Sequence, residues 1–341
     1  MKTSRQIVYD TLAGKNKERA PRQLWTLAWA WHHHPDEMKK LVADFPDDVV
    51  GVGAPLKKTS PRVKGDPNEI GEYTDDFGCT FTNVQRGVIG EVKCPLVQAD
   101  DWSDADKAHI PAEWLSFDIG EANAALEKHA PDKFRLAGFC ARPFEQLQFI
   151  RGTENLYVDL MDMPPGLRAF MNKLHTFYCD LCEKWAQTDA DCLFFMDDWG
   201  TQRSLLINPA LWRELFKPMY KDYIDIAKKH GKKAFMHSDG YTLDILPDLA
   251  ELGLDAVNAQ IFCMGLDNLK PLRGKLTFWG EIDRQWLLPR GTADDIRKAV
   301  RQVRDALYDD GYCIAQCEFG AGAKPENVYT VFQAWDEITG R

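Results

Sequence analysis

Short apolar runs alternate with amphipathic stretches over most of the second half of the chain. Each run has the length and composition of a buried strand, and each amphipathic stretch has helical periodicity. Strands that alternate with helices predict a parallel sheet. The expected strands are Phe134–Cys140, Cys192–Met196, Lys233–His237, Asp255–Asn258, Leu276–Gly280 and Tyr312–Gln316, and the expected helices lie between Phe144 and Gln187 and at Asn208–His230, Leu243–Leu252, Thr292–Tyr308 and Pro325–Ile338.

The first hundred residues add two more strands and a region of different character. A helix is expected from Ser4 to Gly14, and Thr3 or Ser4 can cap it. Around residues 71–97, short alternating runs separated by Asp-Asp and Arg-Gly turns predict a small antiparallel insertion. The other expected elements are strands at Arg22–Trp29 and Asp48–Gly53 and a helix at Pro35–Phe45.

Together these patterns give seven or eight β-α units, the number that closes a barrel. We therefore predict an α/β protein whose residues 1–341 form one domain: a single (β/α)₈ TIM barrel with an N-terminal helical extension and the antiparallel insertion. An open doubly wound sheet is the competing architecture. The dinucleotide-binding version of it is disfavoured, because no Gly-x-Gly-x-x-Gly motif joins a strand to a helix.

Composition and charge narrow the class of protein. The chain has 341 residues, 45% of them hydrophobic, and a net charge of −10 without any basic block, which argues against nucleic-acid binding. No apolar run approaches the roughly 20 residues of a membrane-spanning helix. The first residues lack the apolar segment of a signal peptide. These features favour a cytoplasmic protein that acts on a small molecule.

The nine cysteines are scattered, and most are expected to be small buried side chains. Cys179 and Cys182 form the only close pair. They lie in a stretch with the pattern of an amphipathic helix, and no second pair is near enough in sequence to complete a zinc cage. Helix packing is therefore the preferred interpretation.

Polar residues follow directly after several predicted strands, where a parallel barrel places its active site. Asp197 and Asp198 follow one strand, and either could serve as an acid–base group. The other candidates at these positions are Asp239 as a further catalytic carboxylate and Asn258 and Gln260 as substrate-binding residues, together with His237, Glu281 and Cys317.

His237 and Cys317 are the strongest candidates for metal ligands. Neutral imidazole and thiolate both suit Zn²⁺, and a catalytic zinc site has three protein ligands and one open position. The third ligand could be Asp239 or Glu281. Structural alternatives are that His237 is a hydrogen-bonded polar residue and that Cys317 packs beneath the last loop.

The run Trp29-Ala30-Trp31-His32-His33-His34 concentrates aromatic side chains near the start. Successive side chains of a strand point to opposite faces, so the three histidines would not share one metal ion. We expect Trp29 and Trp31 to line an aromatic pocket, with Trp199 as a further substrate-binding residue.

Several of these segments resemble the uroporphyrinogen decarboxylase superfamily, and in particular its decarboxylase-like branch that includes cobalamin-dependent methyltransferases. The resemblance covers most of the chain and implies a TIM barrel. It rests on Arg19-Ala20-Pro21, on Phe195-Met196-Asp197-Asp198-Trp199-Gly200-Thr201-Gln202 with Ile207-Asn208-Pro209, on Phe235-Met236-His237-Ser238-Asp239-Gly240, and on Phe278-Trp279-Gly280-Glu281-Ile282-Asp283 with Leu288-Pro289-x-Gly291-Thr292.

The methyltransferase branch has a His-x-Cys…Cys zinc pattern, to which His237 and Cys317 are similar, whereas Asp239 replaces the middle cysteine. The resemblance implies a zinc-dependent methyltransferase that moves a methyl group between a corrinoid, carried by a partner protein, and a thiol, methyl ether or similar small substrate. The residues that would bind the corrinoid are not identified.

The resemblance leaves other functions open. The region Leu24–Trp29 lacks the arginines that bind substrate carboxylates in the true decarboxylase, so uroporphyrinogen is not the expected substrate. The alternatives are a metal-free lyase that uses Asp197 or Asp198, and a non-catalytic tetrapyrrole- or corrinoid-binding protein. A homodimer is expected only because dimers are the commonest assemblies.

Overall fold

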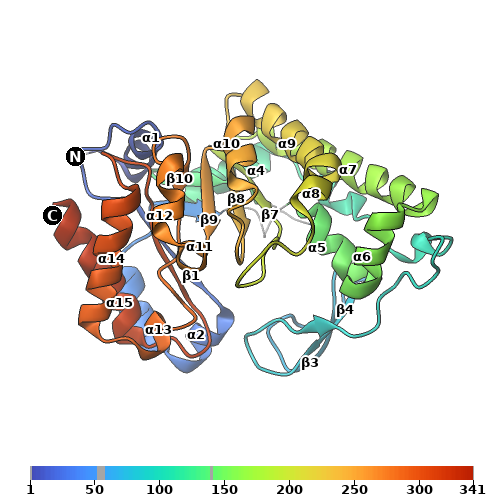
Figure 1. Cartoon of the computed structure of the whole chain (residues 1–341), viewed down its shortest axis with the longest axis horizontal. Coiled ribbons are helices and arrows are strands. Elements are labelled where there is room, and N and C mark those ends of the chain that lie inside the picture. Colours follow the sequence, from blue (N-terminus) through green and yellow to red (C-terminus); the bar gives the residue numbers. More distant parts are fainter. Residues whose placement is uncertain (1, 52–57, 139–140, 341) are drawn as a thin grey trace.

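A large parallel sheet lies at the centre of the computed structural model, which describes residues 2–51, 58–138 and 141–340 (Figure 1). Six strands pair in the order β10-β9-β8-β7-β6-β2, and this sheet curls into a half-barrel. A separate two-stranded parallel sheet pairs β1 with β11. The strands of these two sheets are β1 (Arg22–Thr26), β2 (Val49–Gly51), β6 (Phe134–Leu136), β7 (Cys192–Met196), β8 (Lys233–Ser238), β9 (Ala256–Ala259), β10 (Thr277–Phe278) and β11 (Ala315–Phe319).

Contacts join the two sheets at both ends. The backbone N–H of Asp48 donates to the carbonyl of Arg22 at 2.8 Å, and parallel bridges pair Phe278 with Cys313 and Glu281 with Gln316. The predicted α/β class and the parallel sheet are confirmed, and the fold is TIM-like. Closure of all eight strands into one barrel remains a prediction, because they form two sheets.

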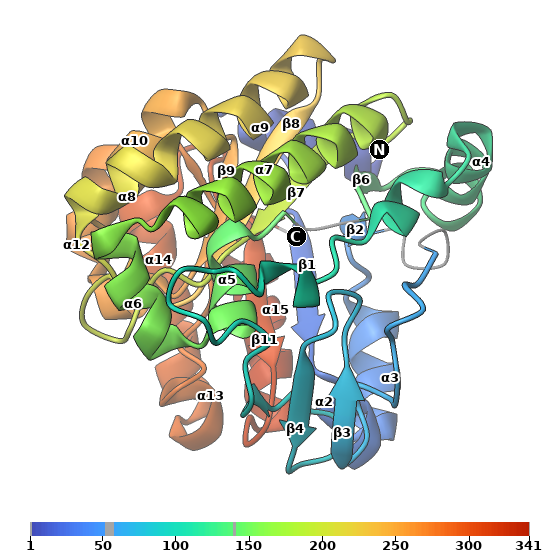
Figure 2. The same ribbon diagram turned by 90° about the vertical axis from the view of Figure 1, so that its right-hand side faces the viewer.

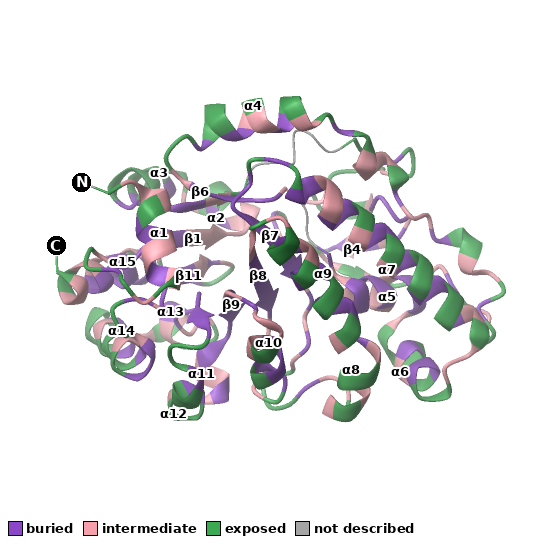
Figure 3. Ribbon diagram, turned by 90° about the horizontal axis from the view of Figure 1, so that it is seen from above, coloured by how far each residue is buried: buried purple, intermediate pink, exposed green. Residues whose placement is uncertain are grey.

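Helices cover the outer surface of the sheets, as seen from above in Figure 3, where buried residues concentrate on the strands and exposed residues on the outer faces of the helices. No helix among the described residues is both long and apolar enough to cross a membrane. The helices are α1 (Ser4–Leu12), α2 (Ala28–His33), α3 (Pro35–Asp44), α4 (Ile119–His129), α5 (Pro143–Arg151), α6 (Thr153–Asp162), α7 (Pro165–Ala186), α8 (Pro209–Leu215), α9 (Lys217–Lys229), α10 (Leu246–Leu252), α11 (Ile261–Met264), α12 (Leu266–Leu269), α13 (Leu287–Arg290), α14 (Ala293–Leu307) and α15 (Pro325–Thr339).

The N-terminal helix α1 begins where the sequence predicts it. Thr3 and Gln6 form a reciprocal capping box, which satisfies backbone donors at the helix start. Val8 is fully buried in a cluster with Val49 and Phe134 from β2 and β6. The extension therefore covers part of the core instead of projecting from the fold.

The antiparallel insertion consists of β3 (Gly71–Thr74), β4 (Thr80–Asn83) and β5 (Glu91–Val92), in the segment where the sequence predicts short strands. Figure 2 shows β3 and β4 at the same end of the molecule as α2 and α3. The insertion therefore lies beside the segment that follows β1, and this position matters for the cavity described below.

Several predicted boundaries differ from the structure. The predicted helix Asn208–His230 is two helices, because Pro218 near the start of α9 lacks the N–H that a continuous helix would need. The predicted strand Arg22–Trp29 ends at Thr26. The last strand is displaced by three residues to Ala315–Phe319. Of the other predicted strand residues, Val52, Gly53, Phe139 and Cys140 lie outside the described residues.

Candidate functional site

The two faces of the parallel strands carry different chemistry. Side chains alternate between faces along a strand. Phe194 of β7 and Phe235 of β8 belong to a buried hydrophobic cluster on the concave face of the sheet. Asp198 follows Phe194 by four residues and His237 follows Phe235 by two, so both side chains lie on this concave face. The intervening residues face the surrounding helices. The chemistry of the site therefore depends on which residues fall on the concave face.

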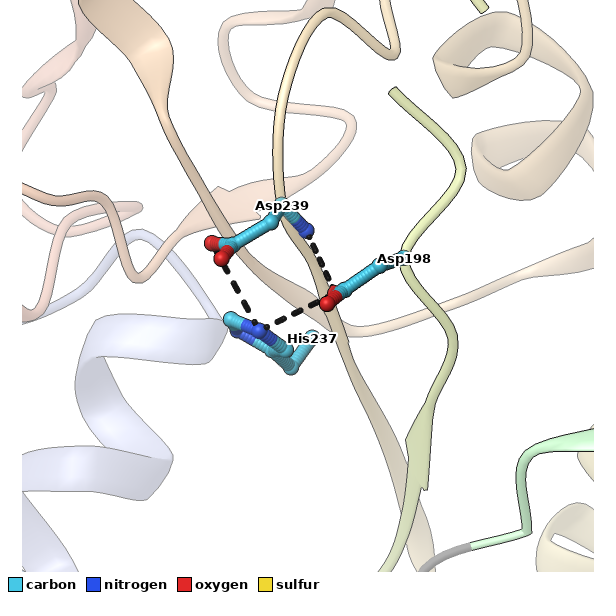
Figure 4. A group of neighbouring side chains, drawn as sticks. All are labelled: Asp198, His237 and Asp239. Carbon is cyan, nitrogen blue, oxygen red and sulfur yellow. Dashed lines mark hydrogen bonds and ion pairs between the residues drawn. The ribbon is translucent and has the colours of Figure 1, made fainter. Parts of the chain in front are cut away.

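Asp198, His237 and Asp239 converge at the carboxyl ends of β7 and β8 (Figure 4). The Nε2 atom of His237 lies 3.4 Å from Oδ1 of Asp198 and 3.6 Å from Oδ1 of Asp239. The backbone N–H of Asp239 also donates to Oδ1 of Asp198 at 3.0 Å. One imidazole nitrogen is thus held between two carboxylates.

The orientation of His237 is fixed by its neighbours. Its Nδ1 lies 2.6 Å from Oδ1 of Asn258, and the amide nitrogen of Asn258 donates to the carbonyl of Trp279. This arrangement makes Nδ1 the donor, which leaves Nε2 to face the carboxylates. The ring of Trp25 packs on the imidazole with a centroid distance of 4.8 Å. The same orientation is typical of histidines that bind a metal through Nε2.

Charge around His237 is strongly negative. Burial disfavours the imidazolium form, but the interactions with Asp198 and Asp239 outweigh it and raise the pKa of His237 to about 9. Burial also opposes ionisation of Asp198, yet the facing imidazole holds the pKa of that carboxyl below its usual range. Without a metal ion, the group therefore has the character of an imidazolium between two carboxylates.

Arg284 links this group to two further carboxylates. Its guanidinium hydrogen-bonds to Asp239 and donates to Oε2 of Glu318 at 2.6 Å, and its Nε lies 3.4 Å from Glu281. Burial raises the pKa of Glu281 to about 8, against the opposing effect of Arg284. Burial raises the pKa of Glu318 as well. Glu281 therefore holds a proton near neutral pH.

The donor atoms fit a divalent metal ion. The nitrogen and the two oxygens lie within 4.8 Å of one another. Ligand atoms in a tetrahedral zinc site are roughly 3.3–3.6 Å apart, which matches both distances from Nε2. Oδ1 of Asp239 is buried and has no hydrogen-bond partner, and neither oxygen of the buried Glu281 has one. The unpaired oxygen of Asp239 beside an oriented imidazole is compatible with a bound metal ion, whereas Glu281 lies outside this group and 3.4 Å from Nε of Arg284.

A cavity of about 890 Å³ opens above the group. Asp198, Asp239, Arg284 and Glu318 line one side of it, together with Glu145 from α5. The opposite side is formed largely by the antiparallel insertion. A cavity of this volume is within the range of small-molecule sites.

The adjacent carboxylates Asp197 and Asp198 have different positions. Asp197 is fully buried and accepts hydrogen bonds from the backbone N–H groups of Phe144 and Glu145 and from the hydroxyl of Tyr220. It therefore caps the start of α5, whereas Asp198 faces the cavity. The structure brings Asp198 and Asp239, but not Asp197, to His237.

Cys317 lies in the middle of β11, not beyond its end. It is fully buried among apolar residues of the cluster that includes its strand neighbours Ala315 and Phe319. Gln316 forms the bridge to Glu281, and Glu318 lines the cavity on the same face. The structure does not bring the thiol into the group around His237, whose two other members are carboxylates.

Of the tryptophans expected in the substrate pocket, Trp199 is fully buried and stacks on Phe144 at 4.1 Å. Trp29 and Trp31 belong to helix α2 instead of a strand, because alanines and the stacking of Trp29 on His33 at 4.4 Å favour helical geometry here. Trp31 is 44% exposed. The described lining of the large cavity includes none of these three tryptophans.

Asn258 and Gln260 both lie close to the site but make different contacts there. Asn258 positions His237, as described above. Gln260 accepts a hydrogen bond from Gln202 at 2.8 Å and lines a smaller cavity of about 170 Å³ that also contacts Glu281 and Arg284. Both therefore remain candidates for contact with the site.

Three residues at the site, Glu145, Arg142 and Arg284, are not among those predicted from the sequence. Arg284 follows Glu281-Ile282-Asp283 directly, so its place just after a strand was a usable signal. Glu145 and Arg142 lie at the start of α5, and the pattern of the sequence gives no reason to select them. Their role at the cavity depends on the tertiary arrangement.

Comparison with known proteins identifies the class to which this fold and site belong. The family model described as uroporphyrinogen decarboxylase (URO-D) matches residues 73–338. The chain therefore belongs to the uroporphyrinogen decarboxylase family, as its motifs indicate. No curated protein matches the chain in a direct sequence search.

Among solved structures, a methyltransferase from Methanosarcina mazei matches over 100% of both chains with 16% sequence identity and a TM-score of 0.68. A B12-independent methionine synthase from Shewanella sp. W3-18-1, in complex with selenomethionine, matches over 65% of this chain and 66% of that chain, with 12% identity and a TM-score of 0.45. At this level of identity, the first similarity establishes a shared fold.

Proposed function

We propose that this protein is a zinc-dependent methyltransferase whose active site is the group Asp198, His237 and Asp239. In this proposal the strands of both parallel sheets form one functional barrel, and its carboxyl-terminal rim carries the site. The observation that supports it most directly is the placement of Nε2 of His237 at 3.4 and 3.6 Å from carboxylate oxygens of Asp198 and Asp239, two residues that line a large cavity. Membership of the family and the fold shared with a methyltransferase are consistent with it.

A bound zinc ion would favour the thiolate form of a thiol substrate, or would act as a Lewis acid on the oxygen of a methyl ether. Residues of this chain orient the zinc ligands and balance their negative charge. Asn258 holds the imidazole with Nε2 toward the carboxylates, and Arg284 fixes Asp239. Glu281, which holds a proton near neutral pH, can give one to a leaving group.

The methyl group would move between the small substrate in the cavity and a corrinoid on a partner protein. This part of the proposal comes from the resemblance to the methyltransferase branch. It is tested by mixing the purified protein with methylcobalamin and a small thiol such as 2-mercaptoethanol, and by following loss of the methylcobalamin absorbance. We expect turnover that depends on both the protein and zinc.

The metal site itself is tested by zinc analysis after supplementation and dialysis. We expect about one equivalent of zinc per chain in the wild type, and less than about 0.2 equivalents in the variant His237→Ala. Lys39→Ala, which alters an exposed residue of α3, is the matched control and retains zinc. A wild-type protein that binds no zinc under these conditions would contradict the proposal.

A second candidate is a metal-free lyase related to the decarboxylases. It is favoured by one observation: without metal, the imidazolium of His237 lies between two carboxylates and can act as a proton donor. A lyase of this kind would remain active after treatment with a chelator. A methyltransferase of the proposed kind loses activity with the chelator and regains it with zinc.

A further inference from the structure

The antiparallel insertion is anchored at its base and only lightly attached at its tip. At the base, Phe81 packs edge-to-face on Phe149 of α5 at 5.0 Å, and Phe77 packs edge-to-face on Trp114 at 5.8 Å. The carbonyl of Phe77 also accepts the backbone N–H of His109 at 3.0 Å. The tip, residues 85–90, lies between β4 and β5 and reaches α2.

One hydrogen bond joins the tip to α2 among the residues that the structure describes. The carbonyl of Gly87 accepts the backbone N–H of Trp29 at 3.2 Å, which is at the long end of the range for such bonds. Trp29 lies in the first turn of α2, where backbone N–H groups have no acceptor within the helix, and Leu27 at the N-cap makes no side-chain capping bond. Gly87 therefore caps α2 from another part of the chain, through a weak contact.

The contact with α2 depends on the absence of a side chain at Gly87. Its φ is +77°, and a Cβ atom there would lie 2.3 Å from the backbone nitrogen of Trp29 and 2.6 Å from its Cα. Any other residue must therefore displace the tip from α2. On its other side, Gly87 donates its N–H to the carbonyl of Asn68 at 2.7 Å, and Arg86 forms an ion pair with Glu69. The tip is thus attached more firmly to the segment before β3 than to α2.

Both sides of this contact line the large cavity. Leu27 and Ala28 line it from the side of α2, and residues 87–90 line it from the tip. Asp198 and Asp239 of the proposed metal site belong to the same lining. The tip therefore bounds the cavity beside α2, and its displacement would widen the approach to the metal site.

We propose that the tip of the insertion is a gate. In the closed state, which the structure shows, Gly87 caps α2 and the cavity admits small molecules. In the open state the tip leaves α2, and a bulky reactant reaches Asp198 and Asp239. Opening requires little free energy, because it breaks one long hydrogen bond whose groups water can then solvate. This inference rests on the proposed function only in taking the bulky reactant to be the corrinoid, and the gate itself depends on the contact with α2.

Hydrogen exchange of α2 tests whether the tip opens. Gly87→Ala places a Cβ atom against Trp29 and should release the tip, so the amides of residues 27–34 should exchange at least about fivefold faster than in the wild type. Gly231→Ala is the matched control and should not change this exchange. Its φ of +69° gives similar backbone strain, but no atom beyond its chain neighbours lies within 4 Å of the added Cβ.

A second variant guards against misfolding of the first. Gly87→Asn adds a side chain with less strain, because asparagine tolerates a left-handed backbone. Circular dichroism confirms that each variant is folded. Exchange in α2 that stays at the wild-type rate in both Gly87 variants would overturn the proposal.

Size-selective labelling tests whether the open state widens the cavity. Ala323→Cys places a thiol in the cavity lining, at a position that is 6% exposed. Its reactions with N-ethylmaleimide and with the bulkier N-(1-pyrenyl)maleimide are followed by peptide mass spectrometry. Adding Gly87→Ala should accelerate the bulky reagent about three- to tenfold, in proportion to the open fraction, and the small reagent less than twofold. Equal acceleration of both reagents, or of neither, would overturn the gate.

Methyl transfer connects the gate to the proposed function. In Gly87→Ala, kcat/KM for methylcobalamin should rise about three- to tenfold, while KM for 2-mercaptoethanol should change less than twofold. Size-selective labelling without methyl transfer in any variant would overturn the proposed function and leave the gate standing. Methyl transfer with unselective labelling would overturn only the gate. Selective labelling with an unchanged kcat/KM for methylcobalamin would overturn the assignment of the corrinoid as the bulky reactant.

Discussion

The concave face and the helix-facing side of the parallel sheet are built from the same strands, yet they put identical residue types to different uses. Asp198 on the concave face lies beside His237, while Asp197, one residue earlier, is buried against helices and caps α5. The concave face carries buried polar atoms without hydrogen-bond partners, such as those of Glu281 and Gln316. On the other side, the carboxylate of Asp197 is fully satisfied by three donors. Asp197 therefore has a structural role, whereas the concave face still offers buried acceptors to a ligand. Unsatisfied groups alone do not separate the two sides, since the indole N–H groups of Trp212 and Trp335 in the outer helices also lack a partner.

The largest effects on zinc binding and on stability are expected when one carboxylate on each side of the sheet is replaced in turn. Asp198→Asn removes a charged ligand and should lower zinc affinity and methyl transfer by about a hundredfold or more. In the metal-free protein below about pH 9 it also removes part of the stabilisation of the His237 imidazolium, so its stability is compared with that of the wild type above this pH. Asp197→Ala leaves the donors from Phe144, Glu145 and Tyr220 without a partner, and should cost about 3 kcal/mol of stability. Metal titration and thermal denaturation of both variants measure these effects.

If the two sides have different roles, the loss of zinc affinity and the loss of stability should occur in different variants. Asp197→Ala that still folds at low temperature should bind zinc with an affinity close to that of the wild type. If Asp198→Asn instead lost stability and kept its zinc, the assignment of the concave face to function would be wrong.

The second prediction concerns pH. In the metal-free protein, the pKa of His237 is raised to about 9 from an ordinary value of about 6.5. A raised pKa of a base in the folded state adds stability below the unfolded pKa, and this stability is lost as pH rises from about 6.5 to 9. The loss should approach about 3 kcal/mol. Saturating zinc, which requires the neutral imidazole, should remove this decline.

The predicted loss of stability is tested by measuring denaturation midpoints between pH 6 and 9.5, once with chelator and once with zinc. Glu281, with a pKa of about 8, titrates in the same range, so both series are best collected in the Glu281→Gln background. Adding His237→Gln to that background should abolish the decline. A decline that persists would show that another group causes it.

These experiments test the difference between the concave face and the helix-facing side of the sheet, which the sequence indicates only in part. Period-two alternation in Ala315-Gln316-Cys317-Glu318-Phe319 separates the two polar residues from Cys317 and its apolar neighbours. In the structure this alternation places Glu318, and not Cys317, on the face with His237. The predicted strand ends at Gln316, three residues before the end of β11, and therefore puts the thiol at the rim, whereas in the structure Cys317 lies at the strand centre.

The order of most elements and the convergence of residues after β7 and β8 could be predicted, because strand ends of a parallel sheet meet at one edge. The orientation of His237 by Asn258 and the link from Arg284 to Glu318 could not, since they depend on side chains from strands far apart in sequence. The contribution of the insertion to the cavity also requires the tertiary structure. Its sequence predicts strands but not their position.

A smaller effect is expected from the neighbours Cys317 and Glu318. Glu318→Gln weakens the ion pair with Arg284 and should reduce methyl transfer severalfold through the altered position of Asp239. Cys317→Ala removes only a buried sulfur, should cost about 1 kcal/mol of stability, and should leave zinc content unchanged. Loss of zinc in Cys317→Ala would restore the thiol as a ligand and contradict the placement of β11.

The smallest effect should come from Trp31, which lies on α2 and is 44% exposed. Trp31→Ala should change stability by less than about 0.5 kcal/mol and turnover by less than about twofold, because surface substitutions away from packed features are nearly neutral. Trp25→Leu is the informative partner, since the Trp25 ring packs on His237 at 4.8 Å. It should weaken zinc binding severalfold by loosening the imidazole. Equal effects of the two substitutions in zinc titrations would mean that the aromatic packing on the concave face does not support the metal site.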